Sequence, residues 1–395
     1  MNSNEILKPE VQQYIIEKTG SDISKLAFQK NPFPEIDFKI ILNQIEARTK
    51  SKNKLTTWFN TSKIIYPSKI SIEQTSSEIT AQYKSEIISG KSIIDLTGGF
   101  GVDAYYFSKK FGKVIHCEIN AELSQIVTHN VKQLKAENIS CETGDSESLL
   151  NQFNQKFDWI YIDPSRRNEA KGKVFLLKDC LPNVPDLQDF YFNYSNNILI
   201  KTAPILDIKA GLTELKNVKA IHIVAIDNEV KELLWMVEKD FEGQSIIKTI
   251  NFNKEKQEQF EFSLPNEEMA TYGLPKDYLY EPNSAIMKSG GFNEISHYFA
   301  IDKLNPNSHL YTSNDLINFP GRIFKIEKII DYNKKEMNLN LAGKQCNITT
   351  RNFNEAVEAI RKRWKIKDGG NQYCFFTTNV NEEKIVLICS KINSQ

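Results

Sequence analysis

The spacing of apolar residues along the chain changes character near residue 90. Before that point, apolar positions recur at helical spacing, as in Val11, Tyr14 and Ile15, which is typical of amphipathic helices. Another helix is expected over Ile72–Ser89, because serines suit its first turn and Gly90 suits its stop. The first 88 residues are therefore predicted to form a helical region.

From Lys91 onward, short β-rich runs alternate with helix-capable segments such as Val102–Lys110. The expected strands are Ser92–Leu96, Lys113–Glu118, Ile139–Glu142, Asp158–Ile162, Asn197–Lys201 and Ala220–Ala225. Such alternation is typical of parallel strands joined by crossover helices, so the sequence predicts an open, mostly parallel α/β sheet. Two later runs, Ser245–Phe252 and Gln259–Leu264, flank a polar stretch and predict a hairpin that adds an antiparallel edge.

The strand–helix alternation stops after Pro265. Residues 266–320 are mixed and are broken by several prolines and glycines. Residues 321–395 carry fourteen Lys and Arg against eight Asp and Glu, a net charge of +6. The sequence therefore predicts four parts: a helical region (1–88), an α/β domain (89–265), a small domain (266–320) and a small basic α+β domain (321–395).

Composition narrows the classes of function. The 395 residues include 50 basic and 50 acidic ones, which excludes a chain-wide basic coat and limits nucleic-acid contact to a local patch. The chain has no stretch of eighteen apolar residues and no secretory signal at its start, so we expect no membrane span. The six cysteines lack CxxC spacing, so we expect a cytoplasmic protein without a disulfide framework or a metal site.

A glycine-rich turn stands where the first strand gives way to a helix. Asp95 ends the strand, Thr97 follows it, and the turn then contains Gly98, Gly99 and Gly101. Glycines let backbone N–H groups approach a ligand without hindrance from Cβ atoms. The end of the turn also fits the GxGxxG/A pattern of NAD and FAD sites. Asp95 argues for another cofactor, because a carboxylate attracts the ammonium group of S-adenosylmethionine and repels a pyrophosphate.

Two more acids stand at the ends of the following strands. Glu118 ends the second strand, about twenty residues beyond the glycines, where a carboxylate can hold both ribose hydroxyls of a nucleoside. Asp145 follows the third strand, where an acid can accept a hydrogen bond from an adenine amino group, although such a residue is more often a helix cap. These positions predict a nucleoside cofactor without choosing between the two classes.

The fourth strand ends in Asp163, Pro164, Ser165 and Arg166, followed by Arg167. Open α/β sheets bind ligands beyond the carboxyl ends of their strands, so these residues should line the reaction site. With the glycine turn and the two acids, they resemble motifs I to IV of the class I S-adenosylmethionine-dependent methyltransferases. The layout is similar in particular to bacterial members with a ferredoxin-like domain and a C-terminal THUMP-like domain, over most of the chain from about residue 65.

This resemblance implies a Rossmann-like domain that binds S-adenosylmethionine through the glycine turn and the three acids. It also implies that residues 266–320 are ferredoxin-like and that residues 321–395 are THUMP-like. Related amino-methyltransferases grip the target amine with an Asp/Asn-Pro-Pro-aromatic tetrad, which places catalysis on Asp163, Pro164, Ser165 and Arg166. Ser165 and Arg166 depart from that pattern, which leaves the target nitrogen open. Thr97 stands in the place of the usual first glycine.

Basic residues elsewhere are candidates for substrate contact. Arg167 and Lys201 lie near strand ends, where a cation can meet a phosphate, although a solvated lysine is an equal interpretation. In the last domain, Arg351, Arg361 and Arg363 suit an RNA backbone, although the macrodipole alone favours cations at the C-terminal end of a helix. THUMP domains bind RNA in the families that carry them, so the resemblance implies an RNA partner.

Three functions compete on this sequence. The first is a methyltransferase that modifies an exocyclic or ring nitrogen of an RNA base. The second is an NAD-dependent oxidoreductase, against which Asp95 and the Asp163-Pro164 strand end both count. The third is a non-catalytic RNA-binding protein on a methyltransferase fold, which the altered residues Ser165 and Arg166 favour.

Overall fold

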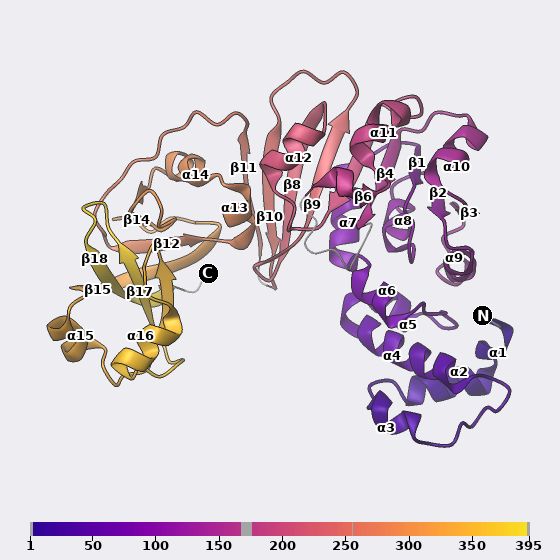
Figure 1. The fold of residues 1–395 in the computed structure, drawn as a ribbon, viewed down its shortest axis with the longest axis horizontal. Helices are drawn as coiled ribbons and strands as arrows, with labels where there is room; N and C mark the ends of the chain where they lie inside the picture. The colour runs from indigo at the N-terminus through magenta and orange to yellow at the C-terminus, as the bar shows by residue number, and fades with distance from the viewer. Residues whose placement is uncertain (1–2, 167–175, 255, 393–395) are drawn as a thin grey trace. The chain divides into compact units, whose positions relative to one another are not determined.

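The computed structural model describes residues 3–166, 176–254 and 256–392. The chain divides into two compact units. The first comprises Met1–Val218 with Leu234–Glu242, and the second comprises Lys219–Leu233 with Gly243–Gln395. Each unit combines helices with β-sheet (Figure 1). Every helix within the described ranges falls short of the length and apolarity that crossing a bilayer requires.

The first unit begins with a series of helices. They are α1 (Ser3–Ile6), α2 (Pro9–Glu17), α3 (Ile23–Ala27), α4 (Phe38–Lys54), α5 (Thr56–Asn60), α6 (Lys69–Gln74) and α7 (Glu78–Ile87). Val11 and Ile15 of α2 pack with Ile41 of α4 in one buried apolar cluster, as the helical spacing predicts. The single helix predicted over Ile72–Ser89 is instead divided into α6 and α7, because the Ser77 side chain accepts an N–H and caps a new helix.

A parallel sheet follows in the same unit. Its strands are β1 (Ser92–Asp95), β2 (Lys113–Glu118), β3 (Ile139–Thr143), β4 (Trp159–Ile162) and β7 (Asn197–Thr202), in the order β7-β4-β1-β2-β3. All neighbouring pairs are parallel, which confirms the predicted topology. The connections contain α8 (Val102–Phe107), α9 (Ala121–Gln133), α10 (Ser146–Phe153) and α11 (Val184–Tyr191). The chain runs from β1 to one side and returns on the other side at β4, and ligands bind at such a reversal.

Shorter elements and one unpredicted strand complete this part of the chain. The short elements are β5 (Ser165–Arg166), η1 (Leu177–Asp179), β6 (Cys180–Leu181) and α12 (Ile208–Glu214). The unpredicted strand is β9 (Glu229–Glu238), which follows β8 (Val218–Ile226) after a two-residue turn. Asp227 and Asn228 both have positive φ there, as hairpin turns of this length require. The hairpin predicted further on is confirmed as β10 (Ile246–Phe252) and β11 (Gln257–Ser263).

The rest of the second unit is built around a seven-stranded sheet. Its strands are β12 (Tyr278–Pro282), β13 (Asp302–Lys303), β14 (Tyr311–Ser313), β15 (Gly321–Asp331), β16 (Asn347–Arg351), β17 (Gln372–Thr378) and β18 (Lys384–Ile392), in the order β13-β14-β12-β15-β18-β17-β16. The helices are α13 (Ser284–Ser289), α14 (Phe292–Phe299), α15 (Lys334–Asn340) and α16 (Val357–Trp364). Because β15 is antiparallel to both β12 and β18, residues on either side of the predicted boundary at 320 share one sheet.

Candidate active site

The carboxyl ends of the parallel strands bring the predicted acids to one edge of the sheet. Asp95 ends β1, and Glu118 ends β2 beside it. Asp163 directly follows β4, which pairs with β1 on the other side. The carboxylates of Asp163, Glu118 and Asp103 all act electrostatically on Asp95. The structure therefore gathers residues from three separate strands and from the first turn of α8 around one point.

The glycine turn between β1 and α8 leaves its backbone open at one position. Gly99 and Gly101 have φ values of +54° and +78°, in the left-handed region that favours glycine. A Cβ atom on Gly98 would lie 2.2 Å from Nε2 of His116, so no side chain fits there. At Gly99 the nearest such atom is 3.9 Å away, the carbonyl oxygen of Thr97. A ligand can therefore approach the backbone closely at Gly99.

Asp95 is buried at the foot of this turn, with 1% of its surface exposed. Burial raises the pKa of its carboxyl group well above the ordinary value, and the surrounding carboxylates add to the rise. The N–H of Thr97 donates to Asp95 Oδ1 at 3.0 Å and offsets only part of this effect. In the described part of the chain, no basic side chain forms an ion pair with Asp95. The site therefore favours a cationic group beside Asp95.

Thr97 connects the glycine turn to the end of β4. Its Oγ1 atom accepts a hydrogen bond from the backbone N–H of Asp163 at 2.6 Å. A glycine at this position could not make that contact, so the departure from the usual glycine has a structural consequence. The sequence predicts Thr97 as a cofactor-binding residue, which stays a prediction, and it gives no sign of the hydrogen bond to Asp163.

The side chain of Asp163 forms an ion pair with Lys201. The Lys201 Nζ atom lies 2.5 Å from Asp163 Oδ2. Lys201 belongs to β7, whose neighbour is β4, so adjacent strand ends deliver the two side chains. The sequence left Lys201 open between contact with a substrate phosphate and a solvated strand end. The structure shows that Lys201 contacts the predicted catalytic acid, and a role in substrate binding stays a prediction.

The side chains of Glu118 and Asp145 accept hydrogen bonds from different parts of the backbone. The Glu118 carboxylate accepts the N–H of Gly99 at 2.9 Å and that of Asn120 at 2.8 Å. A carboxylate has about four acceptor positions, so capacity remains for ribose hydroxyls. Asp145 caps α10 by accepting the N–H of Ser148 at 2.9 Å, and this hydrogen bond lowers the pKa of its exposed carboxyl group. Its contact with adenine stays a prediction.

A buried network that the sequence did not predict surrounds Asp103. Lys84 of α7 is fully buried, and its Nζ atom lies 3.2 Å from Asp103 Oδ1. The hydroxyl groups of Ser76 and Tyr161 both donate to Oδ2 at 2.9 Å. Burial alone raises the pKa of Asp103, but Lys84, Lys201 and the two hydroxyls outweigh it and lower the pKa. In the sequence, the only indication of a role for Asp103 is its position two residues beyond Gly101 of the glycine turn.

The rest of the predicted tetrad lies in and beside a short strand. Pro164 precedes β5, where Ser165 and Arg166 pair through their backbones with β6. Ser165 is exposed. Arg167 and the side chain of Arg166 lie outside the described residues, so their predicted roles remain predictions.

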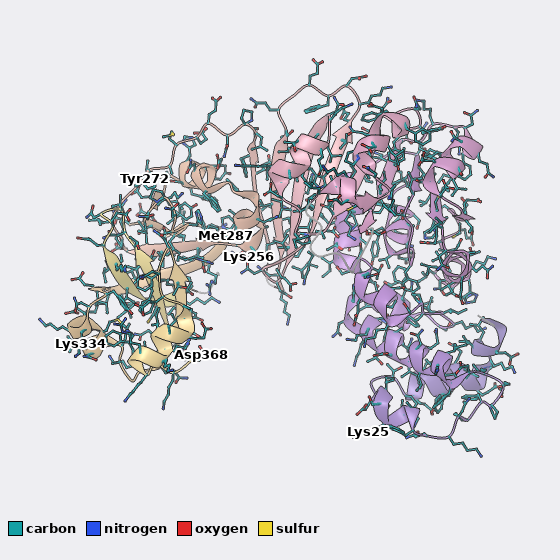
Figure 2. All side chains as sticks on the ribbon, in the orientation of Figure 1. Lys25, Lys256, Tyr272, Met287, Lys334 and Asp368 are labelled. Carbon is teal, nitrogen blue, oxygen red and sulfur yellow. The ribbon has the colours of Figure 1, made fainter. Side chains whose placement is uncertain are left out.

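The three arginines predicted to contact RNA already have acidic partners. Nitrogen–oxygen ion pairs join Arg351 to Glu281 (2.8 Å), Arg361 to Asp368 (2.5 Å) and Arg363 to Glu355 (3.1 Å). Asp368 lies shortly after α16, as its label shows (Figure 2). The exposed side chains of Lys362, Lys365 and Lys367 have no acidic partner within the described ranges. The unbalanced positive charge near α16 therefore comes from lysines.

Three known families match successive parts of the chain. Residues 50–180 match the family described as conserved hypothetical protein 95. Residues 278–320 match a ferredoxin-like domain, and residues 321–391 match a family described as THUMP domain-like.

Individual relatives cover different shares of the chain. The crystal structure of a candidate methyltransferase from Porphyromonas gingivalis W83 is 30% identical, covers 100% of both chains and has a TM-score of 0.88. An uncharacterised RNA methyltransferase from Clostridium acetobutylicum is 31% identical over 118 residues, which are 28% of this chain and about a quarter (26%) of that relative. A candidate methyltransferase from Escherichia coli is 20% identical over 41% of this chain and 85% of its own, with a TM-score of 0.30. The chain therefore belongs to the bacterial methyltransferase family in which a class I methyltransferase domain is followed by ferredoxin-like and THUMP-like domains.

Proposed function

We propose that this protein is an S-adenosylmethionine-dependent methyltransferase that modifies a nitrogen of an RNA base. The observation that carries the proposal is the buried carboxylate of Asp95, which has other carboxylates around it and no basic partner in the described part of the chain. An ammonium group offsets the cost of burying that charge. A pyrophosphate would meet repulsion there, which disfavours NAD and FAD.

The residues at the sheet edge fit this cofactor. Asp95 would hold its amino group, Glu118 its ribose hydroxyls and Asp145 its adenine amino group. The open space at Gly99 suits a ligand that lies against the backbone. The bound cofactor supplies a methyl group on a positively charged sulfur atom, which needs no further activation. Asp163 would orient the attacking nitrogen and accept its proton.

The choice of RNA as the substrate rests on the second unit. Residues 321–391 match a THUMP domain-like family, and the relative from Clostridium acetobutylicum, which matches 28% of this chain, is named as an RNA methyltransferase. The net charge of +6 over residues 321–395 suits a phosphate backbone. RNA is therefore the substrate class that the second unit favours.

Calorimetry followed by a labelling assay tests the proposal. The protein should bind S-adenosylhomocysteine and should not bind NADH. It should then transfer label from methyl-labelled S-adenosylmethionine to RNA from cells that lack this gene, and Asp163→Ala should abolish the transfer. A protein that binds S-adenosylhomocysteine and RNA but labels no nucleoside would instead favour the non-catalytic RNA-binding protein.

A further inference from the structure

Lys201 places an ammonium group directly beside the carboxylate of Asp163. The two residues follow paired positions on neighbouring parallel strands, since Ile162 of β4 pairs with Ile200 of β7. The side chain of Asp163 is 34% exposed and that of Lys201 is 13% exposed. The reaction edge therefore offers an anionic acceptor and a cationic donor side by side.

This pair distinguishes two kinds of target nitrogen. An exocyclic amine gains positive charge as it attacks a methyl group, and a neighbouring ammonium group opposes that charge. The ring nitrogen of a lactam, an N–H beside a C=O, instead loses its proton as it reacts. Negative charge then develops on the carbonyl oxygen, and a cationic donor that is already in place stabilises it.

We propose that the target is a lactam nitrogen of an RNA base, N1 of guanine or N3 of uracil. Asp163 meets the ring N–H, and Lys201 meets the adjacent carbonyl oxygen. This inference rests on the proposed function and narrows its substrate class. As the new N–C bond forms, the C–S bond of the methyl sulfonium donor breaks and its electron pair stays on sulfur. The ring proton passes to the Asp163 carboxylate and then to solvent, while Lys201 keeps its proton.

Further contacts support a pair that is held in place before the substrate arrives. The backbone of Asp163 is fixed by its hydrogen bond to Thr97 Oγ1. Lys201 also interacts electrostatically with Asp103, which Lys84 anchors. Two opposite charges in fixed positions can orient a base edge through two contacts. Such orientation agrees with a tetrad in which Arg166 replaces the stacking aromatic residue.

The identity of the methylated nucleoside tests this inference. RNA from cells that lack the gene is incubated with the full-length protein and methyl-labelled S-adenosylmethionine, then digested and analysed by mass spectrometry. Label in 1-methylguanosine or 3-methyluridine supports the inference, and the two products distinguish the two bases. Label in N6-methyladenosine or N2-methylguanosine overturns it but leaves the proposed function standing. Absence of label from every nucleoside overturns both.

A substitution at Lys201 provides a second, independent readout. Lys201→Met should slow methyl transfer by about 100-fold or more near pH 7, the usual effect of losing one oxyanion donor. The deficit should shrink at alkaline pH, where the lactam ionises without help, and Lys201→Arg should retain most of the rate. Lys216→Met, which removes an exposed lysine paired with Asp189, is the matched control. S-adenosylhomocysteine affinity verifies folding, and a folded Lys201→Met protein with the wild-type pH profile would overturn the role.

Discussion

Among single residues, Asp95 is the carboxylate whose burial and acidic surroundings most favour a bound cation. Its pKa is raised by burial and by the acids around it, so the folded protein keeps this proton to a higher pH than the unfolded chain does. The stability of the cofactor-free protein should therefore fall as pH rises above the ordinary carboxyl range. A bound cation beside Asp95 instead lowers the pKa of this carboxyl group, because it favours the ionised carboxylate.

We expect Asp95→Asn to raise the Tm of the cofactor-free protein at pH 7 by about 1 °C, equivalent to roughly 1 kcal/mol for a chain of 395 residues. The amide can still accept the N–H of Thr97, but it carries no charge to bury. The same variant should bind S-adenosylhomocysteine at least about tenfold more weakly. Scanning calorimetry between pH 5 and 8 measures the first effect, with the exposed Asp189→Asn as a control. A lower Tm with unchanged affinity would contradict this account.

Among the elements, the turn between β1 and α8 depends on the strand beside it. His116 of β2 fills the space next to Gly98, and its Nε2 atom lies 3.3 Å from the carbonyl oxygen of Gly99. The glycines are recognisable in the sequence by their pattern. The histidine that makes Gly98 necessary is not, because residues 98 and 116 meet only in the folded sheet.

Gly98→Ala should lower the free energy of unfolding by about 1–3 kcal/mol and abolish S-adenosylhomocysteine binding, because the added methyl group overlaps the His116 ring. His116→Ala in the same chain should restore part of the lost stability. Urea unfolding of the single and double variants measures the coupling. Gly112→Ala is a suitable control, since a Cβ there would be no closer than 3.5 Å to its nearest neighbour. Strictly additive effects would show that His116 is not the obstacle.

The network around Asp103 joins α7, α8 and β4. Lys84→Met should destabilise the protein by about 3–5 kcal/mol, because it leaves the Asp103 carboxylate buried without its ion-pair partner. The pKa of Asp103 is lowered in the folded protein, so its ionised carboxylate contributes to the stability of the fold. This contribution is present above the ordinary carboxyl pKa and is lost as pH falls through the lowered value. Asp103→Asn should recover part of the loss in the double variant, measured by urea unfolding. If the double variant is as unstable as the sum of the single changes, the ion pair contributes nothing.

In the molecule as a whole, the ferredoxin-like and THUMP-like sequences are parts of one folded sheet. Phe324 of β15 packs with Leu279 of β12 and Leu387 of β18 in a single buried cluster. Deleting residues 321–395 would therefore remove the strand that pairs with β12 and expose its core. Contact with RNA is better tested by substitutions on the surface near α16.

Replacing Lys362, Lys365 and Lys367 together by Gln should weaken RNA binding and reduce its dependence on salt. Log affinity falls with log salt concentration, and each phosphate contact with a single strand contributes about 0.7 to the steepness of that fall. Loss of three contacts should therefore make the slope shallower by about 2. Gel-shift titrations at several salt concentrations measure it. The same change at exposed Lys30, Lys39 and Lys52 in the helical region is the control. Equal slopes for the lysine variant and the wild type would place the RNA elsewhere.

The parallel strands and the cluster of acids at their ends could be predicted from the sequence because each rests on a local signal. Hydrophobic runs marked β1, β2, β3, β4 and β7, and parallel topology then brought their carboxyl ends together. Strand β9 was missed because the Asp227-Asn228 turn that introduces it was not recognised. The break between α6 and α7 was missed because helical spacing continued across the serine cap.

The sequence by itself determined the fold class, the glycine turn and the positions of Asp95, Glu118 and Asp163, because these depend on local propensity and on chain order. Only the tertiary structure decided which groups meet. In the folded chain, Lys201 forms an ion pair with Asp163, and Lys84 forms one with Asp103. Acidic side chains likewise pair with Arg351, Arg361 and Arg363. The physical reason is that an ion pair depends on distance in space, and separation along the chain does not fix that distance.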